Sequence, residues 1–397
     1  MKSNYKRLGD FIEFYNIRAI ELDKNLDIES IRGISSISKS FIKTKANLVG
    51  VVADKYKVVT KNCFAYNPNT ARMGDRIPIA LNTTSEIVLV SSIYPTFKIV
   101  KTNELVPEYL MMWFKRCEFD RYARNKSHGS AREVFDIEEM NELVMPIPSI
   151  EKQQELVREY NTIQNRIAHN KQLINKLEET AQAIYKQWFV EGIDLQNLPV
   201  GWKTKVLSEI ASIKGGKRLP KGEELNDLKL GRPYIKVADM KKTKYLVLND
   251  KFQYVSNDIQ SLISRYIINS GDLIISIVGT IGMINIIDDS LNNANLTENC
   301  FKINGFKLLN ANYLYHYLNS EIGKRVIEER TVGGVQGKLP MYNVESMPIL
   351  IPEENLLHRF NTIIDKIDKT TLNKIKENQK LEELKELLLV RMVRVEN

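Results

Sequence analysis

Residues Glu151–Val190 read EKQQELVREYNTIQNRIAHNKQLINKLEETAQAIYKQWFV and carry the strongest periodic signal of the chain. Apolar residues recur here at alternating spacings of four and three, which is typical of a coiled-coil seam. Asn170 is the one polar seam residue, and a lone polar residue at such a position often fixes the register of the pairing. We expect a helix of about 60 Å that begins near Glu151 and ends before Gly192. The predicted seam is Leu156, Tyr160, Ile163, Ile167, Asn170, Ile174, Leu177, Ala181, Ile184 and Trp188.

A second segment repeats this pattern about 200 residues later in the chain. In its middle, Thr370, Lys374 and Glu377 fall on the seam, so we expect the apolar stripe to shift there toward Leu372 and Ile375. We expect the two helices to pair as an antiparallel coiled coil, the alternative being that each braces its own domain. The second predicted seam is Leu356, Phe360, Ile363, Ile367, Leu381, Leu384 and Leu388.

Shorter matches between the halves indicate a tandem duplication. Leu8-Gly9-Asp10-Phe11 resembles Leu207-Ser208-Glu209-Ile210, Tyr109-Leu110 matches Tyr313-Leu314, and Tyr160-Asn161-Thr162-Ile163 matches Phe360-Asn361-Thr362-Ile363. Outside the helices, short apolar runs bounded by Gly, Pro, Asn and Asp predict strands, among them 86–90, 95–100, 245–248 and 273–278. The expected fold is α+β, with globular domains at 1–150 and 198–352 and long helices at 151–197 and 353–397.

Composition places the chain among ordinary soluble globular proteins, with 43% hydrophobic and 27% charged residues. The three cysteines, Cys63, Cys117 and Cys300, lie far apart without metal-ligand spacing, which favours a reducing, cytoplasmic setting. The first residues lack the apolar core of a signal peptide, and the most apolar stretch, 266–287, is too polar to span a bilayer. We therefore expect no membrane association.

The motifs that resemble catalytic sites all depart from the pattern their chemistry needs. Gly333–Leu339 is one residue too short for a phosphate loop and ends in Leu339 where Ser or Thr would bind magnesium. Asn67-Pro68 lacks the second Pro and the aromatic residue of a methyltransferase corner, and Glu383-Leu384-Lys385 has no Pro-Asp partner. The four histidines are scattered. We expect no catalytic residue and no metal site.

Positive charge is concentrated in the two globular blocks. The formal net charge is +8, and basic residues outnumber acidic ones in residues 1–150 and 198–352 but not in the helical segments. Such blocks favour nucleic acid as a partner, since Lys and Arg hold phosphates while Arg, Asn, Gln and Ser/Thr read bases. For any single residue a solvated surface is the simpler interpretation. The candidate DNA-binding residues are Lys43, Lys45, Lys61, Arg72, Arg76, Lys217, Arg218, Lys236, Lys241, Lys242 and Lys244.

Several local motifs are similar to those of one family. Gly271–Ser276 with Gly279–Gly282, and Arg232–Met240, resemble the second target-recognition domain of the specificity (S) subunits of type I restriction-modification systems. Pro146–Gln154 resembles their domain-to-helix junction. The first domain departs from this pattern, since 61–68 lacks the Gly-Asp-Leu form, and 351–355 lacks the Glu-x-Gln of the first junction.

The resemblance implies two target-recognition domains in tandem, each followed by a conserved helix. It implies a non-catalytic subunit that recognises a bipartite, asymmetric sequence in double-stranded DNA and docks two modification (methyltransferase) subunits on its coiled coil. Restriction motor-nuclease subunits would join for cleavage. S-adenosylmethionine, ATP and Mg would belong to these partner subunits, and this chain would hold no cofactor. Tyr185, Trp188 and Phe189 would either contact a partner or cap the core of the helix pair.

Two other function classes stay open at the level of the sequence. A coiled-coil scaffold protein without DNA binding would keep the helices but make no use of the basic blocks. A self-contained nuclease or methyltransferase would need turnover by the chain alone. The departures from the catalytic motifs argue against the second alternative.

Overall fold

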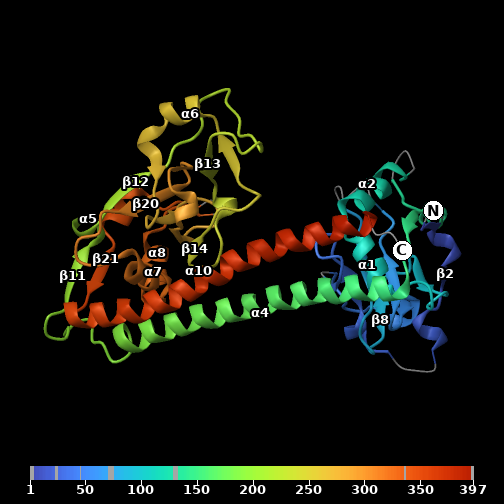
Figure 1. The fold of residues 1–397 in the computed structure, drawn as a ribbon. Coiled ribbons are helices and arrows are strands. Elements are labelled where there is room, and N and C mark those ends of the chain that lie inside the picture. Colours follow the sequence, from blue (N-terminus) through green and yellow to red (C-terminus); the bar gives the residue numbers. More distant parts are fainter. Residues whose placement is uncertain are drawn as a thin grey trace. The chain divides into compact units, whose positions relative to one another are not determined.

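The computed structural model has mixed helix and strand and describes residues 4–22, 26–44, 46–69, 76–127, 133–334 and 337–394. Its contacts divide the chain into two compact units. The first unit is Met1–Ile167 together with Leu381–Asn397, and the second is Ala168–Lys380. Two long helices, α4 (Ile150–Phe189) and α10 (Glu354–Arg391), each contribute a segment to both units (Figure 1). Among the described residues no helix is both long and apolar enough to cross a membrane.

The first unit is built from short strands and a group of short helices. Its helices are α1 (Pro107–Phe114), α2 (Cys117–Asn125) and α3 (Ile137–Asn141). Its strands are β1 (Tyr5–Arg7), β2 (Ile12–Tyr15), β3 (Arg32–Ile34), β4 (Phe41–Lys43), β5 (Lys57–Val59), β6 (Cys63–Tyr66), β7 (Ile79–Leu81), β8 (Val88–Val90), β9 (Thr96–Ile99) and β10 (Val144–Pro146).

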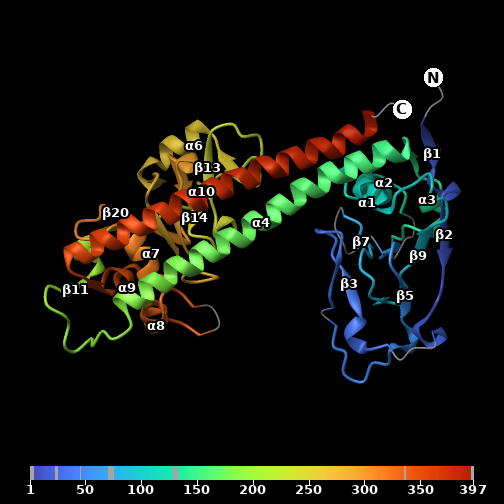
Figure 2. The same cartoon turned by 60° about the horizontal axis from the view of Figure 1, so that its bottom comes forward.

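An antiparallel sheet of order β2-β9-β6-β7 forms the centre of the first unit. Strand β6 is buried along its whole length, so its run of apolar residues suits an inner strand. Phe64 on β6 stacks on Phe97 of β9 with ring centroids 4.8 Å apart, and Phe114 of α1 meets both rings edge-on. In Figure 2, α1 and α2 lie at one end of this unit, and β3 and β5 extend toward the other.

The helix segments of the first unit pack on this core through apolar side chains. Leu156 and Tyr160 of α4 belong to the same buried cluster as Leu388 and Leu389 of α10 and Met392 beyond it. The two ends of the described chain also meet in this unit. The Tyr5 hydroxyl donates a hydrogen bond to the Val393 carbonyl oxygen over 3.4 Å. The last residues thus return to the first strand.

The second unit contains a larger set of elements between its two helix segments. Its shorter helices are α5 (Leu207–Ile210), α6 (Asn257–Leu262), α7 (Ala311–Asn319), α8 (Glu321–Arg330) and α9 (Met341–Glu345). Its strands are β11 (Lys203–Val206), β12 (Ser212–Gly215), β13 (Arg232–Ile235), β14 (Tyr245–Leu246), β15 (Gln253–Val255), β16 (Ile267–Ile268), β17 (Leu273–Ser276), β18 (Ile284–Ile287), β19 (Ala294–Leu296), β20 (Cys300–Asn304) and β21 (Pro348–Ile351).

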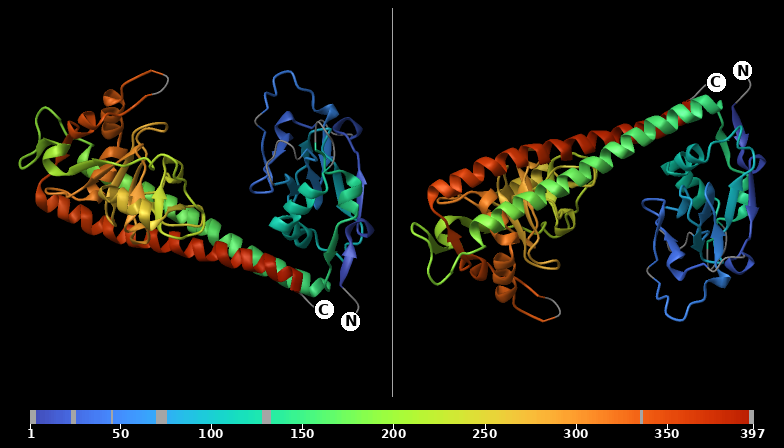
Figure 3. Two further views of the ribbon diagram at one scale, coloured as in Figure 1. Left: turned by 90° about the horizontal axis from the view of Figure 1, so that it is seen from above. Right: turned by 90° about the horizontal axis from the view of Figure 1, so that it is seen from below.

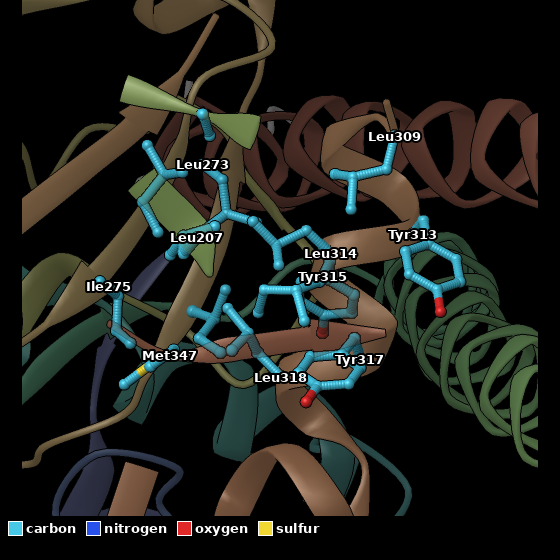
Figure 4. Close-up of a cluster of buried hydrophobic side chains, with 14 of the residues drawn as sticks. Leu207, Leu273, Ile275, Leu309, Tyr313, Leu314, Tyr315, Tyr317, Leu318 and Met347 are labelled. Carbon is cyan, nitrogen blue, oxygen red and sulfur yellow. The ribbon is translucent and has the colours of Figure 1, made fainter. Parts of the chain in front are cut away.

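Helix α7 fills the space beside the central sheet of the second unit. Leu314 and Leu318 of α7 share one buried cluster with Leu273 and Ile275 of β17, as Figure 4 shows. On another face of α7, Tyr313 contacts Phe189 of α4, with ring centroids 5.1 Å apart. One continuous core therefore joins the sheet to the long helices within this unit.

The two units use the same strand order. The sheet β12-β20-β17-β18 of the second unit repeats the antiparallel order β2-β9-β6-β7 of the first and adds β14 in parallel. Equivalent hydrogen bonds recur as well. The hydroxyl of Tyr109 donates to the carbonyl of Pro146 over 3.0 Å, and that of Tyr313 donates to the carbonyl of Leu350 over 2.8 Å. These matches follow the repeat seen in the sequence.

The first domain's departure from the Gly-Asp-Leu pattern leaves its central strand intact. Asn62, directly before β6, has φ of 63°, and Gly271, two residues before β17, has φ of 81°. Asn is one of the few residues besides Gly that enters this left-handed region readily. A residue in the left-handed conformation therefore precedes the central strand in both units, although the residue types differ.

Helix α4 buries nearly the face that its sequence predicts. In the second unit Asn170 donates a hydrogen bond from its amide to that of Asn378 over 3.0 Å, and Tyr185 meets Phe360 with ring centroids 5.9 Å apart. Rising numbers on α4 thus face falling numbers on α10, and the two segments lie side by side in both views of Figure 3.

At the end of α4 the predicted seam is displaced by one residue. Ile184 and Trp188 are half-buried, whereas Tyr185 and Phe189 are fully buried. A straight α-helix drifts by about 20° per heptad against a strict 3.5-residue repeat. Four heptads separate Leu156 from Ile184, so the buried face has moved by nearly one position there.

The seam predicted for α10 needs a larger correction. Leu384 is 51% exposed, so its place on the seam is wrong. Leu356, Ile363, Ile367 and Leu381 are half-buried, and only Phe360 and Leu388 of the predicted set are fully buried. The side chains buried in place of the others include polar ones, which an apolar pattern cannot find. They are Leu357, Ile364, Asp368, Thr371, Asn378 and Leu389.

Candidate nucleic-acid interface

The predicted basic residues of the first unit are on its surface where the structure describes them. Lys43, Lys61 and Arg76 are exposed. Lys43 ends β4 and lies opposite Arg32 in the β3–β4 hairpin, so two cations share one end of this ladder. Lys45 and Arg72 lie outside the described residues.

Lys39 in the turn of that hairpin is buried instead of facing solvent. Its backbone has φ of 48°, and its ammonium lies 2.6 Å from the Asp120 carboxylate of α2. The same carboxylate accepts a hydrogen bond from the Ile77 backbone N–H over 3.1 Å. Burial lowers the pKa of Lys39, and the Asp120 charge opposes this shift. Lys39 therefore anchors the hairpin that carries Lys43.

In the second unit, Lys217 and Arg218 are exposed in the loop that follows β12. The loop is held by backbone hydrogen bonds from Gly216 N–H to Cys300 O (3.0 Å) and from Lys217 N–H to Leu296 O (2.8 Å). A Cβ at Gly216 would come within 1.9 Å of the Thr297 carbonyl oxygen, so only glycine fits. The loop is thus fixed on the turn between β19 and β20.

Lys236, Lys241 and Lys242 lie on the segment between β13 and β14. Lys241 and Lys242 are exposed, while Lys236 is half-buried and donates to Gln253 Oε1 over 2.6 Å. The buried amide of Asn285 on β18 donates hydrogen bonds to the carbonyls of Lys241 (3.0 Å) and Thr243 (2.6 Å). This amide holds the backbone, and the two lysine side chains face solvent.

The prediction that Lys244 binds DNA is wrong. Its ammonium is buried 2.6 Å from the Asp368 carboxylate of α10, and its backbone N–H donates to Glu178 of α4 over 2.9 Å. Tyr245 donates its hydroxyl hydrogen to the same Asp368 oxygen over 2.9 Å. Burial lowers the pKa of Lys244 and raises that of Asp368, and their mutual attraction opposes both shifts. Lys244 binds the globular part to both helix segments of its unit.

Further polar contacts join the same parts of the second unit. The Gln182 amide of α4 pairs with buried His316, at 3.0 Å from its Nδ1. Lys376 of α10 lies 3.0 Å from Asp288, and Gln379 donates to the Leu248 carbonyl over 2.7 Å. Burial lowers the pKa of His316 well below its usual range, so this ring stays neutral. Helix α7 and the residues that follow β14 and β18 are thus connected to the long helices through directional bonds.

The aromatic residues at the end of α4 belong to the core. Tyr185 and Phe189 are fully buried against Tyr313 and Phe360. Trp188 is half-buried, and the Arg359 guanidinium lies 5.5 Å from its ring centroid. Of the two interpretations left open above, the core explains Tyr185 and Phe189.

The described part of the chain has no cluster of His, Cys, Asp or Glu that could hold a metal ion. Cys63, Cys117 and Cys300 are unpaired thiols. Within the rejected phosphate loop, residues 335 and 336 lie outside the described residues, and the flanking Gly337 and Leu339 belong to the chain between α8 and α9.

Sequence reasoning missed the residues that hold the basic segments in place. Gly216, Asn285 and Glu298 carry no motif by themselves. The pair Gly215-Gly216 was one usable signal, because glycine at a strand often marks a close backbone approach. Glu298 lies 80 residues from its partner Arg218, and nothing local predicts that contact.

Residues 199–384 match the family described as type I restriction modification DNA specificity domain. The chain is 21% identical over 316 residues to the specificity subunit of the type I restriction enzyme MjaIX of Methanocaldococcus jannaschii, covering 74% of this chain and 70% of that protein. It is also 21% identical over 367 residues to the specificity subunit of HindI of Haemophilus influenzae, covering 73% and 77%.

The fold is similar to a crystal structure of the S subunit of a type I restriction-modification system from M. genitalium. The TM-score is 0.55 at 14% identity, and the match covers 99% of this chain and 96% of that one. Residues 199–384 thus match a type I restriction modification DNA specificity domain, and about three quarters of the chain is similar to specificity subunits of type I restriction enzymes.

Proposed function

We propose that this chain is the DNA-reading, non-catalytic subunit of a type I restriction-modification complex. The observation that carries the proposal is the repeated sheet order β2-β9-β6-β7 and β12-β20-β17-β18, with exposed cations on loops beside both sheets. Two related but unequal reading domains suit a bipartite, asymmetric site in double-stranded DNA. Lys and Arg at such loops would neutralise phosphates and make binding fall steeply with salt.

Within this proposal, α4 and α10 form an antiparallel coiled coil over their length and dock two methyltransferase subunits. The chemistry would lie in partner subunits that use S-adenosylmethionine, with ATP and Mg in the motor-nuclease, and the complex would act in the cytoplasm. The cluster that contains both Tyr160 and Leu388, and the ring contact between Tyr185 and Phe360, support the pairing.

Duplex binding by the purified chain, with its methyltransferase partner present, tests the proposal directly. We expect sequence-selective binding whose logarithm falls linearly with the logarithm of salt concentration. Charge reversal at Lys43 and Lys61, or at Lys241 and Lys242, should reduce binding and flatten this salt dependence. Unchanged retention of DNA by both variants would favour a scaffold without DNA binding. Modification of DNA by the chain without partners would favour a self-contained enzyme.

Methylation mapping in the host genome tests the biological role. Deletion of the gene should abolish adenine methylation at one bipartite motif. Replacement of residues 198–330 by the matching segment of a relative should change one half of that motif and leave the other half intact. If both halves changed, the assignment of one half-site to each domain would be wrong.

The spacing between the half-sites gives a separate test of the helix pair. Matched insertions of one heptad into α4 and α10 keep the seam in register and should lengthen the gap between half-sites without changing either. An insertion of seven residues into the connection between Phe189 and Lys203 is the control, since it lies outside both helices. An unchanged gap with the matched insertions would contradict the role of the helices as a spacer.

A further inference from the structure

The loop after β12 presents one arginine in an unusually well supported position. Arg218 Nε donates a hydrogen bond to Glu298 Oε1 over 2.7 Å, yet the Arg218 side chain is 81% exposed. No described residue accepts a hydrogen bond from its two terminal nitrogens. The ion pair therefore fixes the side of the guanidinium and leaves its outer edge free.

Glu298 is itself held in place. Its second carboxylate oxygen accepts a hydrogen bond from the hydroxyl of Thr297 over 3.0 Å. Burial would raise the pKa of Glu298, but the hydrogen bonds from Arg218 and from the backbone outweigh it, and the net shift is downward. The carboxylate is thus ionised at neutral pH and works as a fixed anion behind the arginine.

The backbone on both sides of the pair is equally constrained. Tyr234 of β13 donates its hydroxyl hydrogen to the Lys217 carbonyl over 2.8 Å, and the Thr297 N–H donates to the Ile235 carbonyl over 3.0 Å. Gly216 allows the loop to approach this turn closely, because any side chain there would collide with the Thr297 carbonyl. The loop that carries Arg218 and the turn that carries Glu298 therefore form one rigid support.

An exposed surface ion pair contributes little to stability, about 0–1 kcal/mol. The contacts that constrain Arg218 are therefore better explained by ligand recognition than by stability, because side chains that recognise a ligand must be held in a fixed orientation. A guanidinium that offers two parallel N–H donors matches the O6 and N7 acceptors of guanine in the major groove. Lys217, which is exposed on the same loop with its ammonium 5.7 Å from the Tyr266 ring centroid, suits a neighbouring phosphate.

We propose that Arg218 reads a guanine in the half-site of the second unit and that Glu298 is its positioning residue. This inference rests on the proposed function, because it requires that the chain binds duplex DNA. It goes further by naming one residue pair and one base. Lys217 and Arg218 then have different roles, although they are neighbours in the sequence.

The test compares base preference and total affinity in the full-length chain with its methyltransferase partner. Duplexes selected from a random pool by the wild type define the two half-sites. Binding of Arg218→Lys, Arg218→Ala, Glu298→Gln and Lys217→Ala is then measured on that duplex and on single-base variants at several salt concentrations. Glu13→Gln is the matched control, since it removes an exposed ion pair of similar length, 3.1 Å from Lys98, in the first unit.

We expect Arg218→Lys and Arg218→Ala to lose about tenfold in preference for guanine at one position, consistent with a bidentate contact of about 1–3 kcal/mol. Arg218→Lys keeps the charge and should keep the salt dependence. Glu298→Gln should weaken the same preference by a smaller factor, about threefold, because Arg218 is no longer held. Lys217→Ala should lower affinity for all duplexes equally, and Glu13→Gln should leave the preference for guanine at this position unchanged.

Two results would overturn the inference while leaving the proposed function in place. Equal loss of affinity for every sequence in Arg218→Ala, with full recovery in Arg218→Lys, would make Arg218 a phosphate contact. A half-site without guanine, or wild-type selectivity in all Arg218 variants, would remove the assignment as well. Absence of duplex binding by the wild-type complex would instead refute the proposed function and this inference with it.

Discussion

The two units attach their globular parts to their helix segments by different means. In the first unit, Leu156 of α4 and Leu388 of α10 lie in one buried apolar cluster, and the neutral amide of Gln153 donates to the Glu104 carbonyl (2.7 Å) and accepts from the Val106 N–H (2.9 Å). In the second unit, a buried ion pair between Lys244 and Asp368 adds a charged contact to the apolar one. A neutral amide that loses its partners leaves unsatisfied polar groups, whereas a broken buried ion pair leaves an uncompensated charge, which is more costly. The attachment in the second unit therefore depends more strongly on one polar contact.

Both units contain a buried Lys–Asp pair, and their positions sharpen the contrast. Lys39 and Asp120 lie within the globular part of the first unit and tie a hairpin to α2. Lys244 and Asp368 link the globular part of the second unit to α10. The same chemistry therefore serves a loop in one unit and a helix attachment in the other.

The largest expected effect comes from breaking these pairs. Lys244→Met leaves Asp368 as an uncompensated buried charge and should destabilise the second unit by about 3–5 kcal/mol. Hydrogen exchange measured by mass spectrometry should show lost protection in α10 and β14. In Lys39→Met, by contrast, the loss should be confined to the β3–β4 hairpin and α2.

Two controls accompany that experiment. Lys176→Met removes the partner of Glu179 in an exposed ion pair of the same unit and should cost less than about 1 kcal/mol. The double variant Lys244→Met/Asp368→Leu should recover most of the lost stability. Equal loss of protection in α10 for Lys39→Met and Lys244→Met would refute the proposed difference between the units.

The apolar attachment of the first unit can be tested by truncation. Leu156→Ala removes a fully buried side chain, and we expect a loss of about 2–4 kcal/mol from lost burial and the cavity left behind. Leu384→Ala is the matched control on α10, since that side chain is largely exposed and should cost less than about 0.5 kcal/mol. If Leu384→Ala destabilised the protein as much as Leu156→Ala, Leu384 would be buried on the helix seam, as the sequence predicted.

The hydrogen-bonded amides of Asn170 and Asn378 test the helix pair inside the second unit. Asn170→Leu leaves the Asn378 amide buried without a partner, and we expect a loss of about 1–3 kcal/mol in thermal or denaturant unfolding. Asn170→Leu/Asn378→Leu should be near wild-type stability. A single variant as stable as the double would show that the amides are solvated in solution.

The smallest effect is a pH dependence at Lys115 of the first unit. Burial, with the nearby charges of Lys385 and Lys39, lowers the pKa of Lys115 to about 8, against about 10.4 for an unfolded chain. Between these values the unfolded chain binds more protons, so the stability contribution of this group rises as pH rises from about 8 to 10.

The pH dependence due to Lys115 is measured as the difference in the free energy of unfolding between the wild type and a variant that lacks this lysine. Over that pH range, the free energy of unfolding of the wild type should rise relative to that of Lys115→Met by less than about 1 kcal/mol. The effect is small because solvent screens the half-exposed Lys115 side chain. Lys186→Met, which removes an exposed lysine of α4, serves as the reference. A stability difference that is flat or falls with rising pH would contradict the assignment.

Regular features of the fold could be predicted from the sequence because they depend on local spacing. Helix α4 was expected near 151–191 and spans Ile150–Phe189. The strands expected at 95–100 and 273–278 appear as β9 and β17. Periodicity and turn residues act over a few positions, so a single sequence carries them.

The candidate site could be predicted only in part, because it depends on contacts between distant residues. In the sequence, Lys244 cannot be distinguished from its neighbours Lys241 and Lys242. Its burial depends on the ion pair with Asp368, which lies 124 positions away. Polar side chains at buried positions of α10 likewise displaced the expected seam. The prediction that basic side chains bind DNA stays a prediction for Lys43, Lys61, Arg76, Lys217, Arg218, Lys236, Lys241 and Lys242.

The hydrogen bond between Tyr5 and the Val393 carbonyl has a consequence for how the gene can be rearranged. Because the two ends of the described chain meet in one unit, a short linker could join them at little entropic cost. New ends could then be opened in the connection after Phe189, near Gly192 or Gly201, where the backbone lies outside regular structure. Such a circular permutant should keep every strand pairing and begin with the globular part of the second unit.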